Sequence, residues 1–126
     1  MEMRSQLGRV RGLGASQHGT GHWWAQRITA IALVPLGIWF VINIIGLIGA
    51  DYDTAKAWVS HHGNAVFLSA FIIAMTYHAM LGIQVVLEDY IGCEVKKTVA
   101  LILNKFVFML CGISSLIAVL RLGLGG

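Results

Sequence analysis

Three long apolar runs, separated by short polar stretches, dominate the 126-residue chain. The runs cover residues 28–50, 64–87 and 98–120, and the polar stretches between them, residues 51–63 and 88–97, are predicted to be loops. Each run is long enough for a helix that crosses a bilayer, which needs roughly 20 mostly apolar residues. The pattern therefore predicts an all-α integral membrane protein with three transmembrane helices and no room for a soluble catalytic domain.

The composition agrees with a membrane location. Hydrophobic residues make up 57% of the chain and charged residues only 12%, which is too apolar for an ordinary soluble domain. The net charge of +3 comes from Lys and Arg near the predicted helix ends, so membrane topology explains it better than nucleic-acid binding does. Cys93 and Cys111 fall in different parts of the pattern and form neither a disulfide framework nor a metal motif.

Charge also predicts the topology. The chain divides into a polar N-terminal segment, residues 1–27, and a three-helix anchor, residues 28–126. The N-terminal segment and the second loop hold most of the positive charges near the spans: Arg4, Arg9, Arg11, Arg27, Lys96 and Lys97. The positive-inside rule then places the N-terminus in the cytoplasm and the C-terminus in the periplasm of a bacterial inner membrane. The N-terminal segment lacks the apolar core of a secretory signal, and its many Arg and few acidic residues leave a mitochondrial origin open.

The first span carries two further signals. Pro35 removes one helical hydrogen bond and predicts a bend in the span. Trp23 and Trp24 precede the span and suit the headgroup layer, where an amphipathic ring is half hydrated.

One histidine, His78, lies inside the second apolar run. An ionisable residue at membrane depth is costly and is by default a candidate functional site. On a helix it shares its face with small residues at four-residue spacing: Ala70, Ala74 and Gly82. Such a face allows close approach of either a flat macrocycle, with His78 as a haem ligand, or another helix, with His78 hydrogen-bonded across the interface. Geometry alone leaves both interpretations open.

The number of histidines limits the haem interpretation. A six-coordinate haem of the electron-transfer kind needs two axial side chains, commonly His with His or Met. The other histidines lie at or beyond the edges of the spans: His18, His22, His61 and His62. A haem bound by His78 must therefore be shared with another subunit or a second copy of this chain.

The combined motifs resemble the hydrophobic membrane-anchor subunit of succinate dehydrogenase, respiratory complex II, most closely in its alphaproteobacterial and mitochondrial branch. The resemblance rests on the His-Trp-Trp-Ala-Gln-Arg sequence at residues 22–27 and on His-x-x-x-Gly-x-x-x-Val-x-x-Asp-Tyr at residues 78–90. It covers all three spans in order. One departure is Glu88, where many relatives are expected to have a small or hydroxylated residue.

The resemblance implies a fold, partners and site residues. The fold would be half of a heterodimeric helical bundle, completed by a cytochrome b-type anchor and attached to a flavoprotein and an iron–sulfur protein. His78 would be an axial ligand of the iron of haem b, shared with the partner anchor, and Arg27 would lie near the haem propionates. Asp89 and Tyr90 would contribute to the ubiquinone site. The chain would not be catalytic alone, but would be a non-flavin subunit of the enzyme. It would take part in the electron transport that links succinate oxidation, a step of the tricarboxylic acid cycle, to the respiratory chain.

Two alternatives stay open. The anchor of a quinol:fumarate reductase would have the same features, because the direction of electron flow depends on the quinone and the partner centres. A small multi-helix transporter or scaffold without haem would use His78 for proton transfer or packing, and predicts no chromophore. Singly, Tyr90, Asp89 and Arg27 are explained by ordinary membrane statistics, and their joint placement favours the anchor.

Overall fold

The structure is a computed structural model that describes residues 7, 10 and 19–124. Four helices make up nearly all of the described part: α2 (Gly19–Gly46), α3 (Tyr52–Ser60), α4 (His62–Tyr90) and α5 (Glu94–Gly123). The described residues contain no strand. Three residues used in the topology prediction lie outside them, Arg4, Arg9 and Arg11, and so does His18, which was counted among the histidines beyond the spans.

Helices α2, α4 and α5 are each long and apolar enough to cross a membrane, which confirms the predicted all-α membrane protein with three transmembrane helices. They contain 28, 29 and 30 residues, and a rise of 1.5 Å per residue makes each about 42–45 Å long. Since the hydrocarbon core of a bilayer is about 30 Å thick, the helix ends extend into the headgroup layers. All three helices reach beyond at least one end of the predicted spans, and α2 already begins at Gly19.

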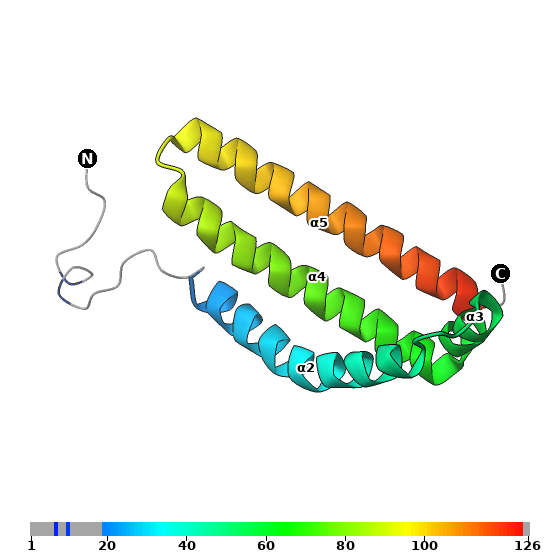
Figure 1. Cartoon of the computed structure of the whole chain (residues 1–126). Coiled ribbons are helices and arrows are strands. Elements are labelled where there is room, and N and C mark those ends of the chain that lie inside the picture. Colours follow the sequence, from blue (N-terminus) through cyan, green and yellow to red (C-terminus); the bar gives the residue numbers. More distant parts are fainter. Residues whose placement is uncertain (1–6, 8–9, 11–18, 125–126) are drawn as a thin grey trace.

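The three long helices form a single layer with α4 in the middle (Figure 1). Helix α4 packs against both α2 and α5, whereas the backbones of α2 and α5 do not approach each other closely within the described residues. Small residues allow the close packing of α4 on α5, since a Cβ added at Gly112 would lie only 3.0 Å from Thr76 Cγ2. The buried Asn104 side chain also joins these helices, because its Nδ2 donates to the Met80 carbonyl at 3.0 Å.

Helix α2 changes direction along its length (Figure 1), and Pro35 lies inside it, as the predicted bend requires. Beyond the bend, Trp39 packs against Phe67 of α4 with the ring centroids 5.3 Å apart. Phe40 stacks on Phe71 of α4 at 4.7 Å. Aromatic pairs therefore hold this half of α2 on α4.

The segment 51–63 was expected to be a loop, and that expectation is wrong because it contains the short helix α3. Asp51 caps this helix by accepting a hydrogen bond from the Thr54 backbone N–H at 3.0 Å. Trp58 fixes it to α2: the indole Nε1 donates to Asn43 Oδ1 at 3.2 Å, and its ring stacks on Trp39. The helix depends on these distant contacts, since nine residues are too few for a stable isolated helix.

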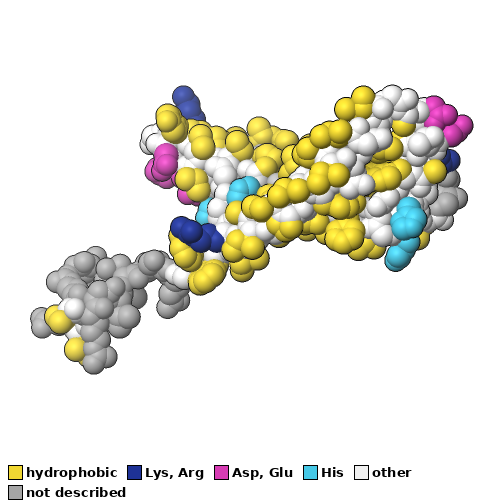
Figure 2. Space-filling view, turned by 60° about the horizontal axis from the view of Figure 1, so that its bottom comes forward, with side chains coloured by type: hydrophobic (Ala, Val, Ile, Leu, Met, Phe, Trp, Pro, Cys, Tyr) yellow, Lys and Arg dark blue, Asp and Glu magenta, His cyan; other side chains and the backbone are white. Residues whose placement is uncertain are grey.

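Few side chains are buried inside the described chain. The buried apolar residues are Ala65, Leu81 and Val119. Figure 2 shows apolar side chains over the body of the molecule and charged side chains gathered toward its two ends. This distribution suits a chain whose sides face lipid and whose ends face water.

Candidate functional site

His78 lies in the middle of α4 and its ring contacts α2 through both nitrogens. Nδ1 is 3.0 Å from Thr29 Oγ1. Nε2 is 3.4 Å from the side-chain Nε2 of Gln26, which is long for a hydrogen bond. The first contact is well formed and the second is weak, so Thr29 holds the ring more firmly than Gln26 does.

Helix α2, which contacts His78 through Gln26, carries two buried polar side-chain atoms of interest. Within the described residues, Gln26 Oε1 and His22 Nε2 are both buried without a hydrogen-bond partner. The two residues are four positions apart on α2, so they share a face. Buried polar atoms without partners are costly, and each requires an explanation such as a water or an absent ligand.

Gly82 lies one turn of α4 beyond His78. Among the described residues, and apart from its own chain neighbours and helix backbone, a Cβ added there would meet only the Nε2 atom of Gln26 within 4 Å, at 3.7 Å. This atom is the end of a flexible side chain, so a rotation of Gln26 opens space beside both Gly82 and His78 Nε2. Gly82 belongs to the face of small residues predicted around His78, and this part of the face therefore lies against α2.

Asp89 and Tyr90 end α4 and are exposed, Tyr90 to 86% of its area. Twelve residues separate Tyr90 from His78, which corresponds to about 18 Å along the helix axis. The neighbouring Glu88 accepts a hydrogen bond from Gln84 at 2.8 Å, so its carboxylate is held along the helix surface. The structure therefore places His78 and the Asp89–Tyr90 pair at two separate levels of the same helix.

Arg27 is exposed on α2, directly after Gln26. Its guanidinium carbon lies 4.4 Å from the centre of the Trp23 ring, a cation–π contact. Among the described residues, no carboxylate lies within ion-pair distance of it. Since α2 begins at Gly19, both side chains belong to this helix.

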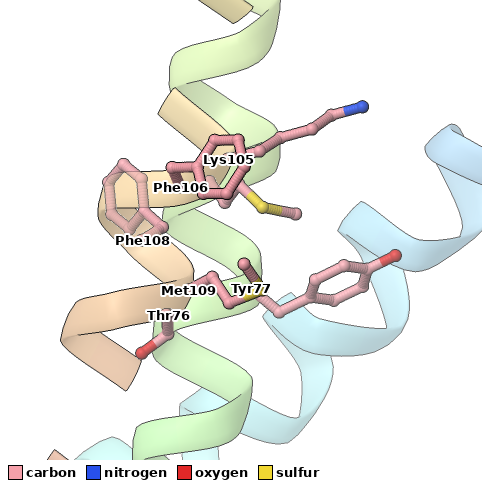
Figure 3. A pocket seen from close by; sticks show the side chains of 7 residues that line it. Thr76, Tyr77, Lys105, Phe106, Phe108 and Met109 are labelled. Atoms are coloured by element: carbon pink, nitrogen blue, oxygen red, sulfur yellow. The ribbon is translucent and has the colours of Figure 1, made fainter. Parts of the chain in front are cut away.

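A cavity of about 520 Å³ lies elsewhere, between α4 and α5 (Figure 3). It is lined by Thr76, Tyr77, Met80, Lys105, Phe106, Phe108 and Met109. In Figure 3, Lys105 and Tyr77 extend to one side of it, away from Phe108. No histidine or carboxylate lines it, so the predicted site residues do not converge there.

Sequence reasoning missed the partners of His78. Thr29 is a polar residue near the start of the first apolar run, and its three-residue spacing from Gln26 places both on one face of α2. That spacing was the available signal. It did not show that this face lies opposite His78, because the pairing of α2 with α4 depends on tertiary packing.

Comparison with known proteins identifies the family. A family model described as "Succinate dehydrogenase/Fumarate reductase transmembrane subunit" matches residues 1–120. The chain is 31% identical to the succinate dehydrogenase hydrophobic membrane anchor subunit of Rickettsia bellii over 97% of its own length and 98% of the relative. It is 30% identical to the subunit of the same name from Paracoccus denitrificans, over 92% and 89% of the two chains.

A more distant relative is the succinate dehydrogenase membrane anchor subunit of Reclinomonas americana, 26% identical over 73% of this chain and 79% of the relative. No solved structure matches the chain significantly. The matches cover all three long helices and extend along nearly the whole chain. The chain therefore belongs to the family of succinate dehydrogenase and fumarate reductase transmembrane subunits, as a membrane anchor of the alphaproteobacterial type.

Proposed function

We propose that this chain binds haem b jointly with a second anchor subunit and contributes Asp89 and Tyr90 to a ubiquinone-reduction site. The observation that carries the proposal is the state of His78. It is a half-buried histidine at membrane depth, firmly held at Nδ1 and only weakly contacted at Nε2, the nitrogen that an axial ligand would offer to iron. Such a haem would supply a one-electron carrier within the membrane.

The residues around His78 fit a haem edge. Gly82 presents no side chain, and the atom that the described part of α2 places beside it belongs to Gln26, which can rotate away. The buried unpaired atoms of Gln26 and His22 are consistent with a polar group of a ligand that binds along this face of α2. Arg27 is exposed one residue from Gln26, and its guanidinium can hold a propionate through two hydrogen bonds.

At the end of α4, Tyr90 and Asp89 suit quinone chemistry. An exposed phenol can donate a hydrogen bond to a quinone carbonyl oxygen and stabilise the negative charge that develops there during reduction. A neighbouring carboxylate can pass in the protons that quinol formation requires. Both groups lie at the end of a span, where the headgroup layer gives access to quinone from the bilayer and to protons from water.

The same proposal includes the partners. The layer of three helices has two open faces, and its few buried residues leave the apolar surface of the chain uncovered. A second, cytochrome b-type anchor would cover one face and supply the second haem ligand, giving a heterodimeric bundle. A flavoprotein and an iron–sulfur protein would attach at the Asp89–Tyr90 end. By the charge rule this end and the N-terminus face the cytoplasm of the bacterial inner membrane, and the C-terminus faces the periplasm.

Purification of the complex tests the proposal. The anchor should copurify with a flavoprotein and an iron–sulfur protein, and the reduced-minus-oxidised spectrum should show a b-type haem. A transporter or scaffold predicts neither partner nor chromophore, so a colourless, isolated chain would contradict the proposal. A quinol:fumarate reductase would give the same spectrum, and the ratio of succinate oxidation to fumarate reduction with quinones of different potential separates the two enzymes.

A further inference from the structure

Thr29 makes three contacts with its single hydroxyl. Oγ1 lies 2.7 Å from the Ala25 carbonyl and 3.1 Å from the Gln26 carbonyl, both on its own helix. It also lies 3.0 Å from His78 Nδ1. A hydroxyl has one proton and two lone pairs, and a carbonyl only accepts. The proton of Thr29 is therefore directed to the backbone, a common arrangement for Thr in helices, and a lone pair faces His78.

The orientation of this hydroxyl determines the protonation pattern of the histidine ring. Because Oγ1 accepts, His78 Nδ1 must carry the hydrogen and Nε2 must carry the lone pair in the neutral ring. The Gln26 contact agrees, since its amide nitrogen faces His78 Nε2 and can only donate. The Gln26 contact is therefore compatible with this tautomer, and the assignment itself rests on the shorter contact with Thr29.

We infer that Thr29 is a positioning residue for the haem iron: it fixes His78 in the Nδ1–H tautomer and directs Nε2 to the metal. The inference rests on the proposed ligation of haem by His78 and goes beyond it by assigning a role to a residue of another helix. Iron-bound histidines commonly donate the other ring N–H to an acceptor, which orients the ring and makes the ligand more basic. Here the acceptor is a side-chain hydroxyl of α2.

This role predicts a property of the haem that simple packing does not. A more basic ligand stabilises the ferric iron, so loss of the Thr29 acceptor should raise the midpoint potential of the haem. It should also free the imidazole plane to rotate and thereby change the g-values of the oxidised haem in electron paramagnetic resonance. Valine has nearly the shape of threonine and no hydroxyl, so Thr29→Val removes the acceptor with little change in packing.

The experiment uses the whole complex and three variants: Thr29→Val, Thr29→Ser and Thr98→Val. Thr29→Ser keeps the hydroxyl. Thr98 is a control, because its hydroxyl also bonds a backbone carbonyl, that of Glu94 at 2.9 Å, but lies on α5. We expect a higher haem potential and altered g-values in Thr29→Val, and wild-type values in the other two variants. A wild-type potential and unchanged g-values in Thr29→Val would overturn the inference.

Two further outcomes are informative. If Thr29→Val loses the haem, Thr29→Ser decides: wild-type haem supports a role for the hydroxyl, and loss of haem in both variants overturns it. The His78→Ala complex separates this inference from the proposed function. If His78→Ala keeps an unaltered haem, the proposed ligation fails and this inference fails with it. If His78→Ala loses the haem while Thr29→Val is unaffected, only the role of Thr29 is wrong.

Discussion

Tyr90→Phe removes one hydroxyl from the end of α4 and tests the proposed quinone site. The Tyr90 side chain is 86% exposed, and its hydroxyl forms no hydrogen bond with the described residues. The substitution should therefore leave folding and helix packing unchanged, so an effect on activity must come from a molecule bound near Tyr90. A neutral hydrogen bond contributes about 0.5–1.5 kcal/mol. At about 1.4 kcal/mol per tenfold change, this corresponds to a roughly 2- to 12-fold loss in kcat/KM for ubiquinone.

The assay compares two electron acceptors in the same purified complex. Succinate oxidation with ubiquinone should fall in Tyr90→Phe by that factor, and oxidation with a soluble artificial acceptor should stay at the wild-type rate. Tyr52→Phe is a matched control, since Tyr52 is also exposed, to 75%, but begins α3 at the other end of the helical layer (Figure 1). Equal rates of ubiquinone reduction in Tyr90→Phe and wild type would refute the role of the hydroxyl. Equal losses with both acceptors would show general damage to the complex.

Two further predictions concern the fold. Gly112→Leu should lower the free energy of unfolding of the membrane domain by about 1–3 kcal/mol, because its Cβ would lie 3.0 Å from Thr76 Cγ2 and force α5 from α4. Denaturation in detergent should show no such loss for Gly37→Leu, since no described atom of another element lies within 4 Å of a Cβ added at Gly37. Hydrogen bonds from the Thr54 hydroxyl and backbone N–H lower the pKa of Asp51. The ionised carboxylate should therefore stabilise α3 above about pH 4, the ordinary range of an aspartate. This stabilisation should be lost as the pH falls further and the carboxylate is protonated. As the pH falls, protection of the Thr54 amide against hydrogen exchange should decrease in wild type. It should not decrease in Asp51→Asn, whose side-chain oxygen caps the helix without titrating. An equal pH dependence of this protection in both proteins would contradict the explanation.

The three spans were predictable because hydropathy and length alone decide whether a segment crosses a membrane. The bend of α2 was predictable for a similar reason, since proline acts within its own helix. Helix α3 was not, because the contacts of Trp58 with Asn43 and Trp39 hold it in place, and those residues precede the connecting segment. Local sequence describes single helices well and contacts between helices poorly.

The candidate site shows the same division. His78 was identified from its place in an apolar run, and its face of small residues from helical spacing. The contacts with Thr29 and Gln26 depend on how α2 is rotated and shifted against α4, which no pattern within either helix determines. Any contribution of other subunits to the haem or the quinone would be equally invisible in this sequence.

The haem spectrum of the complex containing His78→Ala tests the central claim most directly. His62→Ala is its control, because His62 is exposed at the start of the same helix. The account predicts that His78→Ala loses the b-type haem signal or grossly perturbs it, and that His62→Ala retains the wild-type reduced-minus-oxidised spectrum. An unchanged haem spectrum in His78→Ala would contradict the account, even though the chain would remain a membrane anchor of its family.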